Sequence, residues 1–98
     1  MLSDRRLIEE ACRRHESIEF GYEGYRRVGN PHIIGTDKTG ATTVFVWQTL
    51  SGKGSPPGWR HFQLSGLTGL RPTGRHFEPQ RPPPDPKKCG FVQVFATS

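Results

Sequence analysis

The sequence is short of the features that mark several large classes of protein. It has two cysteines, Cys12 and Cys89, which lie far apart in the chain, so we expect reduced thiols and no disulfide framework. No apolar run approaches the length of a membrane span, and no continuous apolar stretch follows the charged first residues as it would in a secretory signal. We therefore expect a cytoplasmic protein with no membrane partner.

Groups for catalysis and metal binding are also scarce. Beyond Glu23 the only carboxylates are Asp37, Glu78 and Asp85, each in a predicted turn or loop, so a carboxylate dyad is not expected. The four histidines and two cysteines show no metal-ligand spacing, and the glycine-rich stretch 51–58 lacks the residue order of a phosphate loop. We predict no catalytic residue, no metal and no cofactor. An unrecognised hydrolase would need two of four side chains to meet in one cleft: His32, His61, Asp37 and Glu78.

Charge is unevenly distributed along the chain. There are 14 Lys and Arg against 9 Asp and Glu, which gives a formal net charge of +5. The part through Asn30 is neutral, and the whole excess lies from Ser51 onward. Such an excess could attract an anionic partner such as a nucleotide or nucleic acid, although it could equally serve solubility.

Length and composition favour one small β domain over residues 1–98. A chain of 98 residues is too short for two hydrophobic cores, and 12 glycines with 9 prolines favour short strands and many turns. The apolar spacing predicts one helix at about 4–14, followed by strands between about 17 and 70. A proline-rich segment, 71–90, should wrap over the surface with Phe77 as its anchor, and a final strand at 90–97 should close the sheet. The fold class we predict is mainly β, a small curled β-barrel of the Sm-like type with one N-terminal helix.

The strongest predicted strand covers 42–50. Val44, Val46 and Leu50 alternate onto one face, and Phe45 and Trp47 onto the other, so both faces should be covered. Glu23 and Gly24 should form a two-residue hairpin turn just before the second strand.

Aromatic and cationic residues are interleaved in the second half of the chain, a mixture typical of sites for nucleotides or single-stranded nucleic acid. Trp47 and Phe62 fit a core role, whereas Trp59 borders a loop rich in Gly and Pro and should be partly exposed. The full set is Trp47, Trp59, Phe62 and Phe77 with Arg60, His61, Arg71, Arg75 and His76.

An ordered set of residues resembles the WYL domain, and more narrowly the small stand-alone WYL-like proteins of bacteria. It covers about residues 5–79 and consists of the helix, Ile18-x-Phe20-x-Tyr22, Arg27-Val28-x-x-Pro31-His32-x-x-Gly35, Val46-Trp47-Gln48, Trp59-Arg60-x-Phe62-x-Leu64-x-x-Leu67 and Phe77-x-Pro79. The sequence departs from the family at two places. Val44-Phe45-Val46 replaces the Trp-Tyr-Leu run, and Ser65-Gly66 replaces an Asp-Arg pair whose arginine is a ligand contact.

The resemblance implies a curled barrel of the Sm type, a cytoplasmic bacterial setting and a ligand-sensing module of transcription regulators. In that family, cationic and polar side chains gather in a pocket thought to take nucleotides or nucleic-acid fragments. The matching ligand positions are Tyr22, Arg27, His32 and Arg60, with Phe62 at a core position. The 98 residues leave no room for a helix-turn-helix, so we expect no DNA-binding regulator on that plan.

Together these observations predict a non-catalytic ligand-binding or regulatory module that senses an anionic ligand, such as a nucleotide or short single-stranded nucleic acid. The predicted ligand-binding residues are Tyr22, Arg27, His32, Trp59 and Arg60. The alternative is a protein-interaction or dimerisation module that uses a strand edge or the proline-rich segment and has no small ligand.

Overall fold

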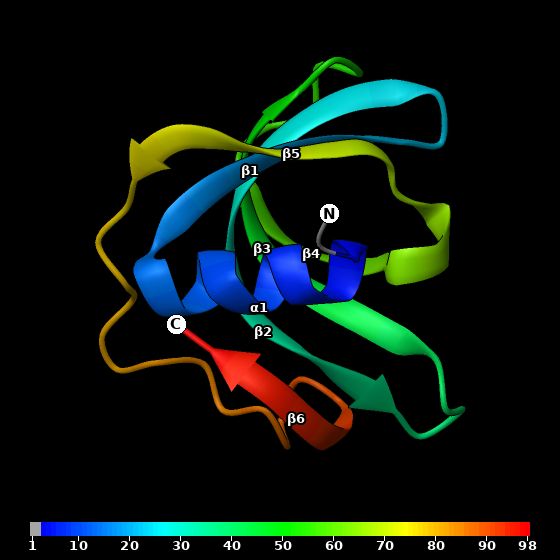
Figure 1. Ribbon diagram of the computed structural model, residues 1–98, viewed down its shortest axis with the longest axis vertical. Helices are drawn as coiled ribbons and strands as arrows, with labels where there is room; N and C mark the ends of the chain where they lie inside the picture. Colours follow the sequence, from blue (N-terminus) through cyan, green and yellow to red (C-terminus); the bar gives the residue numbers. More distant parts are fainter. Residues whose placement is uncertain (1–2) are drawn as a thin grey trace.

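The computed structural model describes residues 3–98, so the first two residues of the predicted domain lie outside it. Residues 3–98 contain one α-helix and six antiparallel strands, which confirms the mainly β prediction with one N-terminal helix. Figure 1 shows how these elements are arranged. The elements are α1 (Asp4–Arg14), β1 (Glu16–Tyr22), β2 (Tyr25–Asp37), β3 (Thr42–Ser51), β4 (Gly58–Gln63), a 3-10 turn η1 (Leu64–Gly66), β5 (Thr68–His76) and β6 (Phe91–Thr97).

Helix α1 begins and ends at specific capping residues. The side chain of Ser3 accepts a hydrogen bond from the Arg6 backbone N–H, and His15 ends the helix in a left-handed conformation with φ 55°. Ile8, Ala11 and Cys12 form the buried stripe of the helix. This stripe packs across one face of the sheet (Figure 1). We call that covered face the inner face and the opposite face the outer face.

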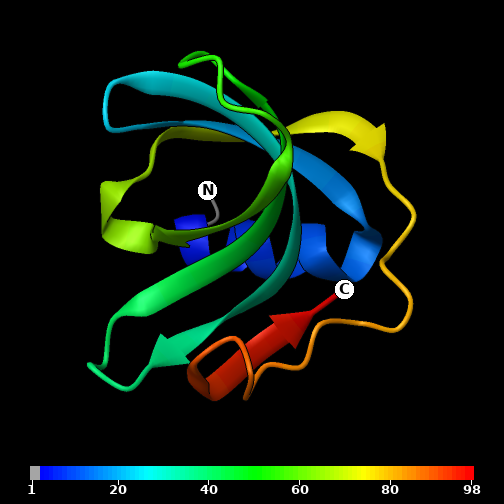
Figure 2. The ribbon, with the colours of Figure 1, turned by 180° about the vertical axis from the view of Figure 1, so that it is seen from behind.

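Strand β2 is the long central strand that joins the two parts of the sheet. Its first half pairs with β1, from Tyr25 to Gly29, and its second half pairs with β6, from Ile33 to Asp37. Pro31 lies between the two pairings, beside a register irregularity with β3. A proline has no N–H to donate, so it fits where β2 changes neighbours. In Figure 2 β2 runs from beside β1 down to β6.

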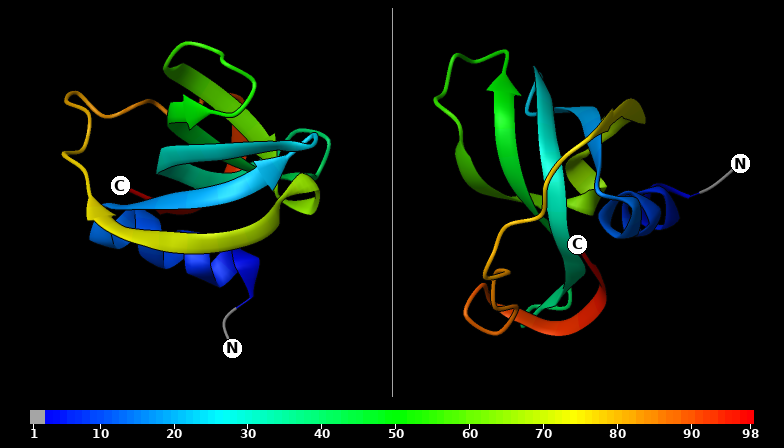
Figure 3. Two further views of the ribbon diagram at one scale, coloured as in Figure 1. Left: turned by 90° about the horizontal axis from the view of Figure 1, so that it is seen from above. Right: turned by 90° about the vertical axis from the view of Figure 1, so that its left-hand side faces the viewer.

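The sheet curls but does not close. Its strand order is β4-β3-β2-β1-β5 with β6 on β2, and no ladder joins the edge strands β4 and β5 among residues 3–98. On the open side, the Gln63 backbone N–H of β4 donates to the Tyr22 hydroxyl of β1 at 3.4 Å, and the Phe62 ring of β4 meets the Tyr22 ring edge to face. Figure 3 shows the curl from above. Strand β6 pairs with the second half of β2 and does not lie between the two edge strands. The expectation that the final strand closes the sheet is therefore wrong.

The boundary predicted for the proline-rich segment is also wrong. Residues 71–76 belong to strand β5, with Pro72 paired opposite Ile18. An edge strand needs ladder hydrogen bonds on one side only, so β5 accommodates a proline that a central strand would exclude. Only residues 77–90 form the connecting segment, which descends along one side of the molecule to β6 (Figure 3, right).

Apolar side chains form two separate clusters, one on each face of the sheet. The larger cluster lies between α1 and the inner face, and it includes Ile18, Phe20, Val44, Val46 and Phe62. The smaller cluster lies on the outer face and consists of Ile33, Phe45 and Phe91, with Trp59 and Cys89 packed against it. Strand β3 thus has both of its faces covered at Phe45 and Val46, as predicted.

Candidate functional site

The five predicted ligand-binding residues divide between the two faces of the sheet. Tyr22 packs against the inner cluster, and Arg27 lies opposite the inner residue Phe20. Arg60 pairs with Val46 and therefore also belongs to the inner face. His32 and Trp59 pack against each other on the outer face, so the structure does not bring all five together.

Arg27 is a buried cation that no carboxylate neutralises. Its side chain is only 7% exposed, and among the described residues it forms no salt bridge. Nη1 donates to the Gln48 side-chain oxygen at 3.1 Å, and Nη2 donates to the Tyr22 carbonyl at 3.4 Å. The guanidinium carbon lies 5.4 Å from the ring centre of Phe62. Two neutral acceptors and an aromatic ring therefore hold a full positive charge inside the protein.

Two hydrogen-bond donors at this point have no partner. The Nε of Arg27 and the Nε2 of Gln48 are both buried and unpaired among residues 3–98. Leaving a buried donor without an acceptor costs roughly 1–3 kcal/mol, and more when the group is charged. Because both orphaned atoms are donors, an incoming oxygen atom with negative charge is the group that would satisfy them.

Gln48 is the central residue that sequence reasoning missed. The alternation of Val44 and Val46 predicted Leu50 on the same face, but Leu50 is 60% exposed. A register irregularity between Val28 and Gly29 places Leu50 opposite Val28 and outside, whereas Gln48, which precedes the irregularity, is fully buried. The signal was present in the sequence, since Gln48 occupies the inward position two residues after Val46.

Arg60 lies close to Gln48 on the neighbouring strand. Gly58 is the β4 residue paired with Gln48, and a Cβ built on Gly58 would lie 2.8 Å from Arg60 Nη1. The absence of a side chain at Gly58 therefore gives the Arg60 guanidinium its place over the strand. Its Nη1 donates to the Trp59 carbonyl at 2.9 Å and its Nη2 to the Pro56 carbonyl at 3.2 Å. No carboxylate pairs with Arg60 in the described part of the chain.

We call Tyr22, Arg27, Gln48 and Arg60 the inner-face site. Two of its members are guanidinium groups and one is an amide with a free N–H, so the site offers donors and positive charge. Tyr22 and Phe62 contribute ring faces, with their centroids 4.9 Å apart. This combination can bind an oxyanion.

His32 has a structural environment on the outer face. Its Nδ1 lies 2.8 Å from the Asn30 carbonyl, and its ring lies 4.9 Å from that of Trp59 and 5.1 Å from that of Phe77. Burial lowers the pKa of His32 below its ordinary value, and the nearby His15 lowers it further. An imidazole held neutral among rings is poorly suited to attract an anion.

Trp59 packs against the outer cluster and is partly buried. Its ring stacks on Phe45 at 4.6 Å with an interplanar angle of 6°, and it meets Trp47 edge to face at 5.2 Å. These contacts make it a packing residue. Trp59 nevertheless remains partly exposed, which confirms the prediction for a residue that borders the loop.

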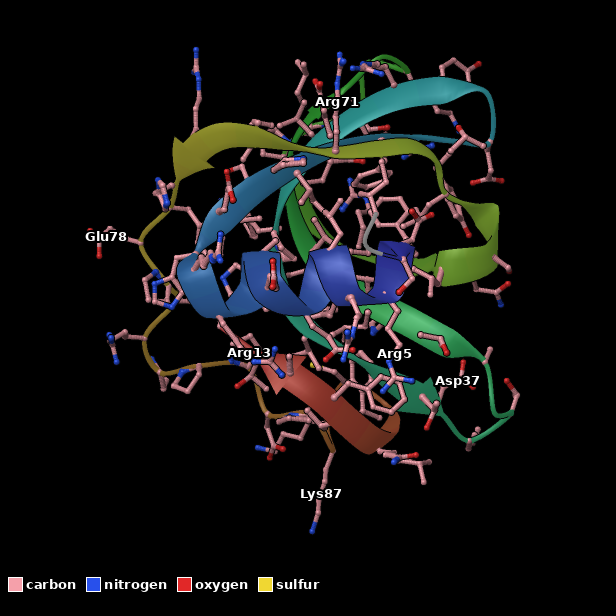
Figure 4. The ribbon with its side chains drawn as sticks, viewed as in Figure 1. Arg5, Arg13, Asp37, Arg71, Glu78 and Lys87 are labelled. Carbon is pink, nitrogen blue, oxygen red and sulfur yellow. The ribbon has the colours of Figure 1, made fainter. Side chains whose placement is uncertain are left out.

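A second concentration of cationic groups lines a groove of about 840 Å³ on the outer face. Arg71 and Arg26 both pair with Glu19, whereas Arg75 forms no ion pair within the described residues. Figure 4 shows Arg71 on β5, directed away from the helix. Glu19 offsets part of the positive charge here, so this groove is less cationic than its arginines alone suggest.

The hydrolase alternative brings two of its four residues into one hollow. Asp37 and His61 both line a cavity of about 520 Å³. The Asp37 carboxylate, however, accepts hydrogen bonds from the backbone and hydroxyl of Thr39 and from the backbone of Ala41, which lower its pKa. His61 Nε2 lies 3.0 Å from the Cys89 carbonyl, and no hydrogen bond joins it to Asp37. Figure 4 shows Glu78 pointing away from the body of the molecule.

Neither thiol is poised for chemistry. Burial raises the pKa of the Cys12 thiol to about 12, so it stays protonated at neutral pH. Burial also raises the pKa of Cys89. Residues 3–98 contain no group of three His, Cys, Asp or Glu side chains that could hold a metal ion.

The sole helix of the described chain is too short and too polar to cross a membrane. Comparison with family models, curated proteins and solved structures gave no match for this chain.

Proposed function

We propose that the protein is a non-catalytic binding module whose inner-face site takes an anionic ligand, such as a nucleotide or a short single-stranded nucleic acid. The observation that carries this proposal is the buried Arg27, which has no carboxylate partner and an unpaired Nε beside the unpaired Nε2 of Gln48. A buried charge normally has a partner of opposite sign. An anion bound here would supply that partner and would accept from both orphaned donors.

The resemblance to the WYL domain supports the same function. Three of its four matching ligand positions, Tyr22, Arg27 and Arg60, lie on one face around Gln48. The antiparallel sheet with a helix across one face shares the mainly β architecture that the resemblance implies, but its edges do not close into a barrel. His32 is the exception, since its ring belongs to the outer cluster. A sensing role in bacterial transcription regulation is part of this proposal.

The substitution Gln48→Glu tests the proposal directly. Glutamate has almost the same shape, and its carboxylate would pair with Arg27 and cancel the charge that attracts the ligand. We expect the variant to stay folded and to bind nucleotides at least about tenfold more weakly, which corresponds to roughly 1.4 kcal/mol. Binding can be followed by NMR titration at low salt, where electrostatic attraction is strongest.

A matched control separates the site from the net charge. Gln93→Glu makes the same change on the exposed face of β6 and should leave affinity nearly unaltered. Equal losses in the two variants would mean that overall charge, not the inner-face site, governs binding. Unchanged affinity in Gln48→Glu would refute the site.

The protein-interaction alternative is supported by a specific surface feature. Val92 and Val94 are 71% and 42% exposed, and they lie two residues apart on β6. Exposed apolar residues on a strand of this kind can mark a contact surface. We expect this alternative to show a mass above one chain in sedimentation, reduced to one chain by Val92→Lys, with no response to nucleotides.

A further inference from the structure

The loop between β3 and β4, residues 52–57, is tied to both sides of the inner-face site. On one side, Ser51 is buried opposite Arg27, and the Gly52 N–H donates to the Arg26 carbonyl at 2.7 Å. On the other side, Arg60 Nη2 holds the Pro56 carbonyl at 3.2 Å. One site residue, Arg60, and the backbone beside another, Arg27, thus hold the two ends of this loop, which is rich in Gly and Pro.

The side chains that hydrogen-bond or stack with the Arg27 guanidinium lie on strands of the sheet. Tyr22 and Phe62 place their rings near the guanidinium, and Gln48 lies on the adjacent strand. Moving any of these would break the sheet or its core. Residues 52–57 lie outside the ladders that hold these strands, so the space beneath this loop is the route to Arg27 Nε that leaves the ladders intact.

The donors at the site favour an oxyanion of high charge density. Arg60 donates two hydrogen bonds to peptide carbonyls. A phosphate oxygen accepts a stronger hydrogen bond from a guanidinium than a carbonyl oxygen does. Entry from one side restricts the shape of the ligand. An internal phosphodiester carries two substituents that must both leave the site, whereas a terminal phosphate has one.

From these observations we infer that the inner-face site takes a terminal phosphate monoester, inserted beneath the 52–57 loop, with Arg60 passing from the Pro56 carbonyl to the phosphate. The ligand is either a free nucleoside monophosphate or the 5′-phosphorylated end of a single strand. This inference rests on the proposed function and adds the chemical group and its route of entry.

The experiment compares three probes by NMR titration of the full chain at low salt. They are a thymidine tetranucleotide with a 5′-phosphate, the same tetranucleotide with a 5′-hydroxyl, and thymidine 5′-monophosphate. We expect the 5′-phosphate to tighten tetranucleotide binding at least about tenfold, and the amide signals of residues 52–57 to shift on binding. Binding of the monophosphate as tight as that of the phosphorylated strand would identify a free nucleotide as sufficient; tighter binding of the strand would favour a strand end.

Two variants complete the test. Arg60→Gln should weaken binding of the 5′-phosphorylated probe and abolish the shift of the 52–57 amide signals on binding. Arg75→Gln makes an equal charge change on the outer face and should do neither. Equal affinity for the two tetranucleotides, still lost in Gln48→Glu, would overturn the terminal-phosphate inference and leave the proposed function standing. Absence of binding by all three probes would overturn both.

Discussion

The two faces of the same sheet treat their polar groups in opposite ways. On the outer face, His32 and His61 are packed among rings, and each has a ring nitrogen within 3.0 Å of a backbone carbonyl. On the inner face, an apolar core surrounds Arg27 and Gln48, and each of these keeps a buried donor without a partner. The outer face therefore satisfies its polar atoms internally, while the inner face does not.

Partnered polar groups of the outer face support the fold, whereas unpartnered polar groups of the inner face fit a binding role, and this small domain holds both kinds. A satisfied buried network stabilises and specifies a fold, whereas an unsatisfied one weakens it. Natural proteins keep such costs mainly where a ligand or a reaction uses them. Under the proposed function, the outer aromatic residues stabilise the fold and the inner polar residues bind the ligand, although the sequence interleaves the two sets.

Trp59→Ala gives the largest effect on the outer side of this comparison. Removal of an indole stacked on Phe45 and packed against His32 should lower the free energy of unfolding by about 3 kcal/mol. Anion affinity of the folded variant should stay within about twofold of the parent protein, because the indole faces away from Arg27. Urea denaturation and nucleotide titration measure the two quantities. A marked loss of affinity in the folded variant would return Trp59 to the binding site.

Arg27→Met should have the reverse pattern. Methionine fills a similar volume without the charge, and it removes both the uncompensated cation and the unpaired Nε. We expect the free energy of unfolding to change by no more than about 1 kcal/mol, and anion binding to fall by at least about tenfold. Arg75→Met serves as the control for charge. A loss of several kcal/mol would show that Arg27 holds the fold together, and the contrast between the faces would fail.

Sequence patterns were sufficient for the elements that depend on local chemistry. The helix follows from its apolar spacing and its Ser3 cap, and the hairpin turn follows from Glu23 and Gly24, whose φ values are 52° and 81°. Strand alternation also identified Phe45 and Val46 as residues of opposite faces. These signals lie within a few residues of the chain, so they do not depend on tertiary packing.

Long-range pairing was not accessible in the same way. The irregularities beside Gly29 and Pro31 decide that Leu50 points outward and that His32 joins the outer cluster, and both depend on the partner strand. The edge position of β5 likewise explains why Pro72 lies in a strand. Arg27 and Arg60 were identified from the sequence, but the missing partners that make Arg27 informative are visible only in three dimensions.

The smallest predicted effect concerns His32 and acidic pH. Burial lowers the pKa of His32 in the folded state below its ordinary value of 6.5, so between these two values the unfolded chain binds more protons than the folded one. The free energy of unfolding should therefore hold its full value above about pH 6.5 and decline as the pH falls through the lowered pKa. Urea denaturation at successive pH values should show this decline in the parent protein and in His76→Phe, whose histidine is exposed. In His32→Phe the decline should be shallower, since the ring that resists protonation is gone. Equal slopes in all three proteins would mean that the outer cluster does not hold His32 neutral, and that the outer face accommodates a charge as the inner face does.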